Sequence, residues 1–515
     1  MATIVLAPPM VRSTEGTNPV DHVLAIDLGA SGGRVIRGSW NLAAGKLELQ
    51  EVHRFDNEPV EVVGTLHWDI LRLFHETQKG IREAIRTLPP GDTIRCLGID
   101  TWGVDFGLLD RKGRLLGNPV HYRDKRTEGQ VSKLSARFGE GVLFRRTGVQ
   151  EFWFNTTGQL SGALEADPNF LQGAETLLFS PDLLNYFLTG RKAAERTIAG
   201  TSQMLRAGQV DWDQDILEKL GVPPHLMQNV LEPGTLLGPL LPEVAREVGL
   251  SPDTQVALVP SHDTESAALA VPSTSGKPFA FISCGTWALL ATELNAPVLG
   301  EEARLGGFSN EAGAFGTNLL LSNIMGMWLV QECKRWWERD GQKWEHRDLV
   351  EWATGAPWGA SLIDVKDPMF STPGDMPGRI EEYCRKKKMP LPQGRGGIIR
   401  CVLESLACEF RSSLEKMEMV TGKQFGELWL VGGGAQNLLL CQLTADICGR
   451  PVFTGPAETT ALGNIACQFV ALGTFSSIAE ARQAVAKSFE VNLYVPSNHE
   501  LAAETFLSWS ANYGG

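Results

Sequence analysis

The chain has 515 residues, of which 43% are hydrophobic, and 47 Lys and Arg against 60 Asp and Glu give it a net charge of −13. This length exceeds one ordinary domain at about 150 residues per domain, and the composition is typical of a folded, water-soluble protein. The acidic balance argues against nucleic acid as a partner, and the lack of any apolar run of about 18 residues argues against a membrane span.

The N-terminal residues 1–21 are expected to form a flexible tail. Pro8 and Pro9 interrupt its short apolar run and no basic segment precedes that run, so a signal peptide is not expected. The nine cysteines include no C-x-x-C pair and lie mostly in apolar runs. This pattern favours buried free thiols in a reducing compartment, and we therefore expect a cytoplasmic protein.

The first half of the chain alternates strand-like and helix-like segments. Apolar, β-rich runs and helical spacing of apolar residues predict strands at 23–29, 34–40 and 95–100 and a helix at 70–88. A hairpin is expected over 106–116, with Lys112 and Gly113 at its turn. Further on, a helix is predicted from Ser180, as its N-cap, to Gly190, which closes it.

The second half repeats this alternation. Strands are expected at 277–285, 287–294, 427–434 and 451–455, and helices at 436–449 and 459–473. The layout of strand, turn and strand at 23–40 therefore occurs again at 277–294. We predict an α/β protein of two lobes, 22–272 and 273–515, with the Pro/Gly/Ser stretch 271–278 as a hinge. Residues 365–397 are expected to form a surface excursion.

Three glycine-rich turns each follow an apolar strand. They are "DLGASGGR" at 27–34, "SCGTW" at 283–287 and "VGGGAQN" at 431–437. Glycines let consecutive backbone N–H groups face an anion, and a carboxylate such as Asp27 beside the first turn suits Mg²⁺. None of the turns is a Walker loop, and each alone also fits a plain packing turn. Together they predict a nucleotide held between the two lobes.

Polar side chains gather where the strand at 95–100 ends. Asp100, Thr101, Trp102 and Asp105 stand at the carboxyl end of this strand, where ligands bind in open α/β sheets. Hydrogen bonds from these groups and stacking on Trp102 would suit a polyhydroxylated ligand. A strand edge with satisfied turn carboxylates is an equally good interpretation. The following stretch, 121–127, is expected to be a solvated charged turn.

The run "SHDTESA" places Ser261, His262 and Asp263 side by side. Neighbouring side chains of an extended segment point to opposite faces, so these three cannot converge as a catalytic triad. No partner for a metal site was expected near His262. Asp263 at the strand-to-helix junction could accept the proton of a hydroxyl group or could cap the helix, and local chemistry does not separate the two.

Eight motifs in order resemble the FGGY carbohydrate kinases, which belong to the superfamily of actin and hexokinase-like ATPases. They cover about residues 22–475 and read "AIDLGASGGRV", "GIDTWGVDFGLLD", "VHYRDKRT", "RTGVQEFWFNT", "SHDTESA", "SCGTWAL", "SNIMGMWLVQ" and "LWLVGGGAQN". The runs "GIDTWGVDF" and "NIMGMWLVQ" are typical of the rhamnulokinase branch of that family. Gly32 replaces a second serine that is common in the family, and Trp153 stands where smaller residues are frequent.

The resemblance implies two ribonuclease-H-like lobes with a central active-site cleft, in which ATP, with Mg²⁺, phosphorylates the 1-hydroxyl of L-rhamnulose. One alternative is a kinase that acts on another ketose, such as L-fuculose or a pentulose. A second alternative is a non-catalytic regulator on the same fold. A monomer or homodimer is expected. Asp263 matches the catalytic base, and Asp27 would hold Mg²⁺ through water. The sugar-side residues are Gly103, His262, Thr264 and Asn323, joined by Asp100 and Trp102, and the nucleotide-side residues are Ala30, Ser31, Gly32, Gly33, Arg34, Thr286, Gln331, Gly433 and Gly434.

Overall fold

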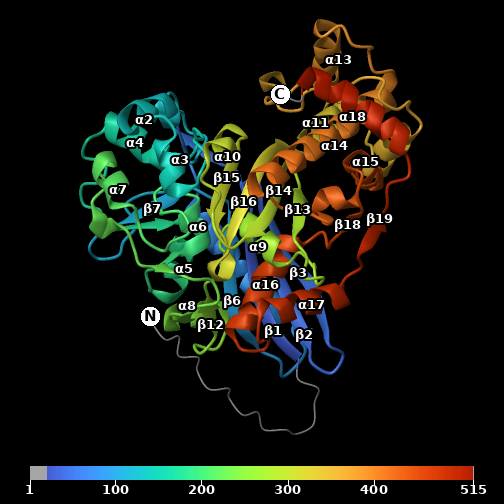
Figure 1. Cartoon of the computed structure of the whole chain (residues 1–515). Coiled ribbons are helices and arrows are strands. Elements are labelled where there is room, and N and C mark those ends of the chain that lie inside the picture. Colours follow the sequence, from blue (N-terminus) through green and yellow to red (C-terminus); the bar gives the residue numbers. More distant parts are fainter. Residues whose placement is uncertain (1–19, 514–515) are drawn as a thin grey trace.

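Two large β-sheets, each covered by helices, form the framework of the protein (Figure 1). The structure is a computed structural model that describes residues 20–513. Of the predicted tail, 1–21, only Val20 and Asp21 belong to this range, and they begin the first strand. The rest of the tail lies outside the described residues.

The first sheet has six strands. In spatial order they are β11 (Leu236–Pro239), β12 (Gln255–Ala257), β6 (Ile94–Thr101), β1 (Val20–Leu28), β2 (Gly32–Asn41) and β3 (Lys46–Asp56). β1, β2 and β3 are antiparallel, whereas β6 runs parallel to β1 and β12 runs parallel to β6. Successive apolar residues of β1 point to opposite faces, so the sheet is buried on both sides.

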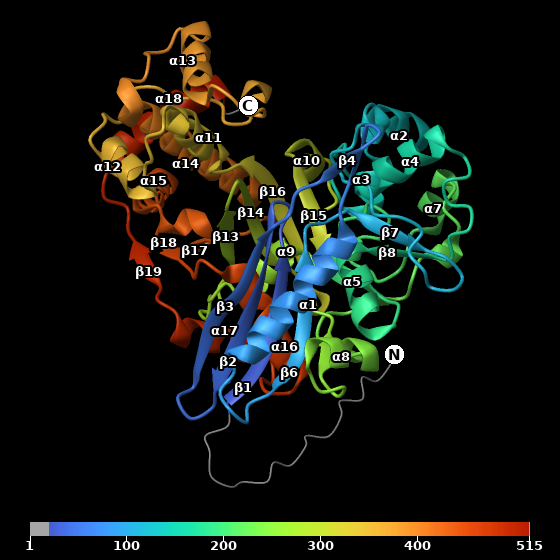
Figure 2. The same ribbon diagram turned by 180° about the vertical axis from the view of Figure 1, so that it is seen from behind.

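Helices from both halves of the chain cover this sheet. One face packs against α1 (Ile70–Arg86), α5 (Ser180–Thr189) and α8 (Pro242–Val248), and the other against α9 (Asp263–Leu269), α16 (Thr459–Ala471) and α17 (Ile478–Ser488). Figure 2 shows α1 lying across the sheet. α16 and α17 come from the second half of the chain but cover the first sheet, which places α9 and α16 between the two sheets.

The second sheet has seven strands in the order β15 (Phe308–Ala312), β16 (Asn318–Met325), β14 (Trp287–Leu294), β13 (Phe279–Cys284), β17 (Glu427–Val431), β18 (Val452–Thr454) and β19 (Asn492–Tyr494). β13, β14 and β16 are antiparallel, β17 is parallel to β13, and β18 is parallel to β17. Both sheets thus contain a run of three antiparallel strands followed by two parallel ones, extended at the edges by antiparallel β11 in the first sheet and by antiparallel β15 and β19 in the second. This repeated arrangement confirms the predicted α/β fold of two ribonuclease-H-like lobes.

The helices of the second lobe share one core with the 28-residue α14 (Gly394–Thr421). The others are α10 (Glu301–Leu305), α11 (Trp328–Trp337), α12 (His346–Thr354), α13 (Met376–Lys386), α15 (Leu438–Cys448) and α18 (His499–Tyr513). Among residues 20–513, no helix combines the length and the apolar character needed to cross a bilayer.

A subdomain with its own core is inserted between β6 and β11. It contains α2 (Gln130–Phe138), α3 (Val142–Thr147), α4 (Thr156–Ala166), α6 (Arg196–Gly200), α7 (Gln214–Leu220) and the strand pairs β7 (Phe106–Leu109) with β8 (Thr176–Phe179) and β9 (Ala194–Glu195) with β10 (Val230–Leu231). A further short pair, β4 (Val60–Val62) and β5 (Thr65–His67), precedes α1. In Figure 1 the subdomain stands beside β15, and α6 contacts that strand.

Several local predictions are confirmed and two are wrong. Gly190 ends α5 with a φ of 69°, and all nine cysteines are buried and free. The N-cap of α5 is Phe179, not Ser180, because Ser180 is already helical and its hydroxyl donates to the Asp105 carbonyl at 3.2 Å. The predicted surface excursion at 365–397 is also wrong, since its α13 buries apolar residues in the second core.

The crossing of α9 and α16 depends on one glycine. A Cβ atom on Gly463 of α16 would lie 1.7 Å from the backbone oxygen of Ser266 of α9. The next residue, Asn464, donates to the Gly98 carbonyl oxygen at 3.1 Å, which ties α16 to β6. The position of α9 therefore requires a residue without a side chain at position 463.

We expect Gly463→Ala to destabilise the protein, because the two helices cannot separate without losing packing on both sheets. Overpacking of this kind lowers the free energy of unfolding by about 1–3 kcal/mol. Thermal unfolding measures the loss. Gly426→Ala is the matched control, because a Cβ there meets open space and its φ is not positive. Equal midpoints for the two variants would contradict the expected close contact.

Candidate active site

Three carboxylates meet at the carboxyl end of the first sheet. Asp27 of β1 and Asp100 of β6 occupy paired positions on adjacent strands. The amide of Thr101 donates to the Ser261 carbonyl at 2.8 Å, which brings the start of α9 and its Asp263 alongside. Asp100 is fully buried and the Asp27 side chain is 7% exposed, whereas that of Asp263 is 35% exposed. Of the three, Asp263 is the one that a ligand can readily reach.

Burial raises the pKa of all three carboxyl groups. The charge of Asp263 adds to the rise at Asp27 and Asp100, and the charge of Glu311 adds to it at Asp263. A different neighbour opposes the rise at each position. Arg34 contacts Asp27 at 2.5 Å, Asn464 donates to Asp100 at 2.5 Å, and His262 lies 3.6 Å from Asp263.

Asp263 is the first residue of α9, and the N-cap is His262. The alternative role of Asp263 as N-cap is therefore wrong. Its Oδ1 accepts a hydrogen bond from the Thr264 hydroxyl at 3.2 Å. The Ser261 hydroxyl donates to the Val259 carbonyl at 3.0 Å, which confirms that no Ser-His-Asp triad forms.

His262 has two acidic partners that the sequence interpretation missed. Its Nδ1 forms an ion pair with Glu311 of β15 at 2.8 Å. Glu265 follows one helical turn later, and a ring nitrogen of His262 and one carboxylate oxygen each of Glu265 and Glu311 all lie within 4.8 Å of one another. The expectation that His262 lacks such partners is wrong; the spacing to Glu265 was visible in the sequence, whereas that to Glu311 was not.

The ion pair decides the charge of His262. Burial lowers the pKa of the imidazole, but the nearby Glu311, Asp263 and Glu265 outweigh burial and raise it to about 10. His262 is therefore an imidazolium at neutral pH, and it supplies a positive charge next to Asp263.

The first glycine turn joins β1 to β2. The Gly29 amide donates to the Gly32 carbonyl at 2.8 Å, and Asn57 closes the turn from outside through the Gly29 carbonyl. Ser31 at the tip is exposed, with Ala30 and Gly32 beside it. A Cβ on Gly33 would lie 2.3 Å from the Phe55 ring. The packing therefore requires a glycine at position 33, which leaves only its backbone for a ligand, and the backbone at the tip of the turn is accessible.

The other two turns lie together in the second lobe. The Thr286 hydroxyl is 3.3 Å from Oε1 of Gln331 on α11, although the two residues are far apart in the sequence. A Cβ on Gly434 would lie 2.5 Å from Sγ of Cys284, so the third turn packs on the second. Gly433 is exposed and its Cβ would meet open space. The structure thus brings together these predicted nucleotide-side residues.

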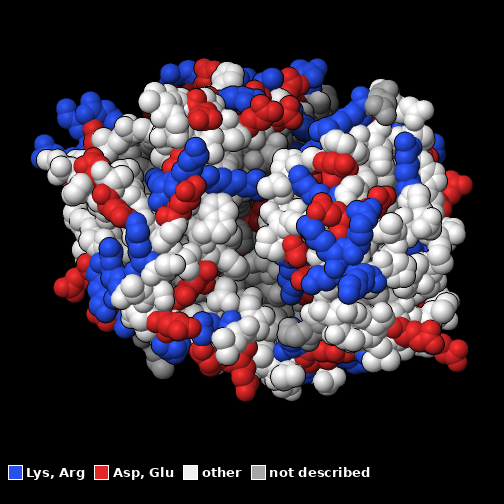
Figure 3. All heavy atoms as spheres, turned by 90° about the horizontal axis from the view of Figure 1, so that it is seen from above, with Lys and Arg blue, Asp and Glu red and all other residues white. Residues whose placement is uncertain are grey.

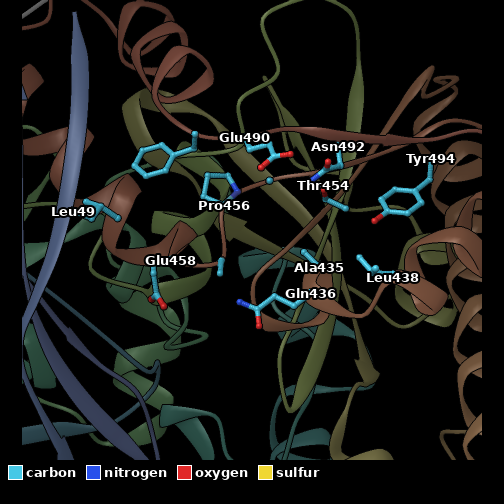
Figure 4. Close-up of a pocket in the computed structure, with 13 residues that line it drawn as sticks. Leu49, Ala435, Gln436, Leu438, Thr454, Pro456, Glu458, Glu490, Asn492 and Tyr494 are labelled. Carbon is cyan, nitrogen blue, oxygen red and sulfur yellow. The ribbon is translucent and has the colours of Figure 1, made fainter. Parts of the chain in front are cut away.

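Arg34 links the first turn to the second half of the chain. Its guanidinium donates to Asp27 and also to Glu458, the N-cap residue of α16. Glu458 lines a cavity of about 350 Å³ together with Leu49 of β3 and with residues that directly follow Gly434 (Figure 4). Residues of both sheets therefore line this cavity. Seen from above, the surface is hollowed between the two halves (Figure 3).

Asp105 anchors an aromatic cluster beside the carboxylates. It accepts hydrogen bonds from the indoles of Trp68 at 2.5 Å and Trp102 at 2.9 Å and from the Gln159 amide at 2.9 Å. Burial raises its pKa to about 6. Because Trp102 is buried and its N–H is engaged, the predicted stacking of a ligand on this ring is not supported. Asp100, which is fully buried, likewise faces Asp27 and Asn464 rather than open space.

The stretch 121–127 is not a solvated turn, so that prediction is wrong. His121 stacks on Trp68 with ring centroids 4.1 Å apart, and Arg126 donates to Gln159 at 2.6 Å. Trp153, which is 44% exposed, lines a second cavity of about 450 Å³ with this stretch. The charged residues were misread because their partners come from other elements.

Gly103 and Val104 form a strained junction after β6. A Cβ on Gly103 would approach the Thr201 side chain to 3.1 Å. Val104 has a φ of 69°, an outlier for a β-branched residue, and hydrogen bonds from its N–H to Thr201 and from Thr156 to its carbonyl hold it there. Such strain is concentrated at functional sites, and the sequence interpretation did not single out Val104.

Asn323 lies near the end of β16. It shares a face with Leu319 and Leu321, which pack against α9, and it pairs with Leu289 of β14. This side chain is partly exposed at the end of the strand nearest the second glycine turn. The structure therefore places Asn323 on the side of the second sheet that faces the helix of Asp263.

Comparisons with known proteins agree with this architecture. Models of the N-terminal and C-terminal domains of the FGGY family of carbohydrate kinases match residues 22–270 and 280–472. The chain is 37% identical over 492 residues to a rhamnulokinase of Bacteroides thetaiotaomicron, covering 96% of this chain and 98% of the relative. It is 38% identical to a rhamnulokinase of Halalkalibacterium halodurans, covering 93% and 100%.

Solved structures show the same fold at low identity. A ligand-bound xylulose kinase from Lactobacillus acidophilus superposes with a TM-score of 0.79 at 17% identity, covering 95% of this chain and 97% of that one. Plasmodium falciparum glycerol kinase with ADP gives a TM-score of 0.76 at 15% identity, covering 96% and 98%.

We expect Asp105→Asn to destabilise the protein, because an amide nitrogen cannot replace a carboxylate oxygen as acceptor for the four N–H donors that Asp105 satisfies, the fourth being the backbone N–H of Tyr122 at 3.3 Å. A buried donor left unpaired costs about 1–3 kcal/mol. Thermal unfolding measures the change. Asp253→Asn is the control, because Asp253 is exposed and should shift the stability by less than about 0.5 kcal/mol. An Asp105 variant as stable as this control would show that these donors find other acceptors.

Proposed function

Because the chain belongs to the FGGY family of carbohydrate kinases, we propose that it transfers the γ-phosphoryl group of ATP to the 1-hydroxyl of L-rhamnulose. The products are L-rhamnulose 1-phosphate and ADP. The observation that carries the proposal is Asp263, the accessible carboxylate of an otherwise buried acidic cluster. Several rhamnulokinases at 36–38% identity over most of the chain support this sugar over the other ketoses.

Asp263 acts as the general base. As the sugar oxygen forms its bond to the γ-phosphorus, the hydroxyl proton passes to the Asp263 carboxylate, and the bond between that phosphorus and the β,γ-bridging oxygen of ATP breaks. The imidazolium of His262 favours the ionised form of Asp263, which must be unprotonated to accept the proton. Closure of the lobes around both substrates would exclude water as the competing acceptor.

Sugar and nucleotide approach the cluster from different sides. His262, Thr264, Gly103 and Asn323 are the proposed sugar contacts. The nucleotide contacts are Ala30, Ser31, Gly32, Gly33 and Arg34 in the first turn and Thr286, Gln331, Gly433 and Gly434 in the second lobe. The proximity of Thr286 to Gln331 and of Gly434 to Cys284 supports the second group.

The acidic cluster fits a magnesium ion. The charges of Asp27 and Asp263 raise the pKa of Asp100, and Oδ1 of Asp100 is buried without a hydrogen-bond partner among the described residues. We propose that Asp27 holds Mg²⁺ through water. When bound, the ion neutralises charge on the phosphates of ATP. Asp27 also orients Arg34 toward the first turn.

Some properties stay predictions. These are a cytoplasmic location, a monomer or homodimer, and the division into a sugar- and phosphate-side lobe, 22–272, and a nucleotide-side lobe, 273–515. Light scattering of the purified chain measures the oligomeric state directly.

Asp263→Asn should lower kcat by at least about 10²-fold, because loss of a general base typically has an effect of this size. ATP binding, measured by calorimetry, should change little, since the glycine turns are untouched. Gln255→Asn, a conservative change on β12, controls for general effects on the first sheet. Near-normal turnover of the Asp263 variant would exclude this residue as the base.

A panel of ketoses with ATP and Mg²⁺ tests the sugar. We expect L-rhamnulose to have the highest kcat/KM, followed by smaller values for L-fuculose and the pentuloses. A coupled assay for ADP measures all of them under the same conditions. A pentulose or L-fuculose as the best substrate would replace L-rhamnulose in the proposal, and nucleotide binding without product from any sugar would favour the non-catalytic alternative.

A further inference from the structure

We propose that Glu311 is a positioning residue for phosphoryl transfer: from the second lobe it holds the His262 ring so that the other ring nitrogen faces Asp263 and the sugar. The proposal rests on the kinase function proposed above. Glu311 lies in β15, outside every motif that indicated the family, and it acts through His262 rather than on the substrate.

The contacts of the imidazole ring carry this proposal. Nδ1 of His262 is 2.8 Å from Oε2 of Glu311, while Nε2 on the opposite edge is 3.6 Å from Oδ1 of Asp263. The side chains of His262 and Glu311 are 13% and 12% exposed. Nδ1 of His262 and Oε2 of Glu311 are buried and have no hydrogen-bond partner among the described residues, so the attraction between their charges is the contact that orients the ring and turns Nε2 toward Asp263.

Glu311 can fix the ring because β15 is itself fastened to the inserted subdomain. The amide of Asn310 donates to the Gly148 carbonyl at 2.7 Å. On the other side, Arg196 donates to the Gly313 carbonyl at 2.6 Å. These bonds flank Glu311 and join the second sheet to residues inserted in the first lobe. The ion pair of His262 is therefore a contact between elements whose relative position is already set.

Among the charged groups around His262, Glu311 has a distinct effect on the imidazole. Asp263 and Glu265 face the ring from α9 and Glu311 faces it from β15, with Glu195 and Glu293 acting on Glu265 from further away. Burial raises the pKa of Glu265 well above its usual range, and Glu311 raises it further. Of the three acids facing the ring, Glu311 has the largest influence on the pKa of His262.

The sign of the expected pH effect follows from this arrangement. With its pKa raised to about 10, His262 keeps its charge through neutral pH and loses it as the pH rises through that value. Without the carboxylate of Glu311, deprotonation moves to lower pH. Asp263 then loses its positive neighbour, and the alkaline limb of the kcat profile should shift downward.

The test compares Glu311→Gln, which keeps the size of the side chain and removes its charge, with the wild-type enzyme. We expect kcat to fall by about tenfold or more, since the variant impairs the general base indirectly. KM for ATP should change by less than about twofold because the nucleotide turns are unaffected, and the alkaline limb should move to lower pH. Ser309→Ala on the same strand is the control: it removes the acceptor of the Gln150 amide and should leave the pH profile unchanged.

A double-mutant cycle separates positioning from a general structural effect. If Glu311 acts through His262, then His262→Asn with Glu311→Gln should be no slower than His262→Asn alone. Additive losses, or a uniform fall in kcat at every pH for Glu311→Gln, would overturn the proposal. A wild-type chain that phosphorylates no ketose would instead contradict the proposed function, so the two failures are distinguishable.

Discussion

The ionisation of three neighbouring carboxylates is the constraint on which this site depends. Asp27, Asp100 and Asp263 converge because β1, β6 and α9 end at the same place, and burial alone would favour their neutral forms. Arg34 and His262 supply the compensating charges. Each of these cations is in turn paired with an acid from the second half of the chain, Glu458 or Glu311. The ionisation of the site therefore depends on both lobes.

The same dependence appears in the packing. Asp263 begins α9, and α9 is held by α16, which comes from the second half of the chain and approaches within backbone contact at Gly463. Asn464, the following residue, reaches Asp100 directly. One helix thus positions the accessible carboxylate through backbone packing and a buried carboxylate through a hydrogen bond. Movement of the second lobe relative to the first would therefore displace both carboxylates.

Aromatic packing sets the other wall of the site. Trp68 stacks against Trp102 and His121, and the indole N–H groups of the two tryptophans converge on Asp105. Asp105 also accepts from Gln159 and from the Tyr122 backbone N–H, so its carboxylate cannot rotate freely and the cluster is rigid. Trp153, which departs from the common pattern of the family, is exposed beside Tyr122 of this cluster, and in the proposed function it is a candidate for selecting the sugar.

The sequence by itself determined the strands that flank the three glycine turns, because apolar strand patterns and glycine conformations are local properties. It also placed Asp263 at a strand-to-helix junction, without separating the two roles of that residue. It failed at 121–127 and at 365–397, where charged or turn-like residues are buried by elements distant in the chain. The tertiary structure alone decided that Asp263 is not the N-cap, that Trp102 turns its N–H to Asp105, and that Glu311 and Glu458 hold the two cations. Ion pairs between distant segments have no periodic signal, since they depend on how the two sheets are placed against each other.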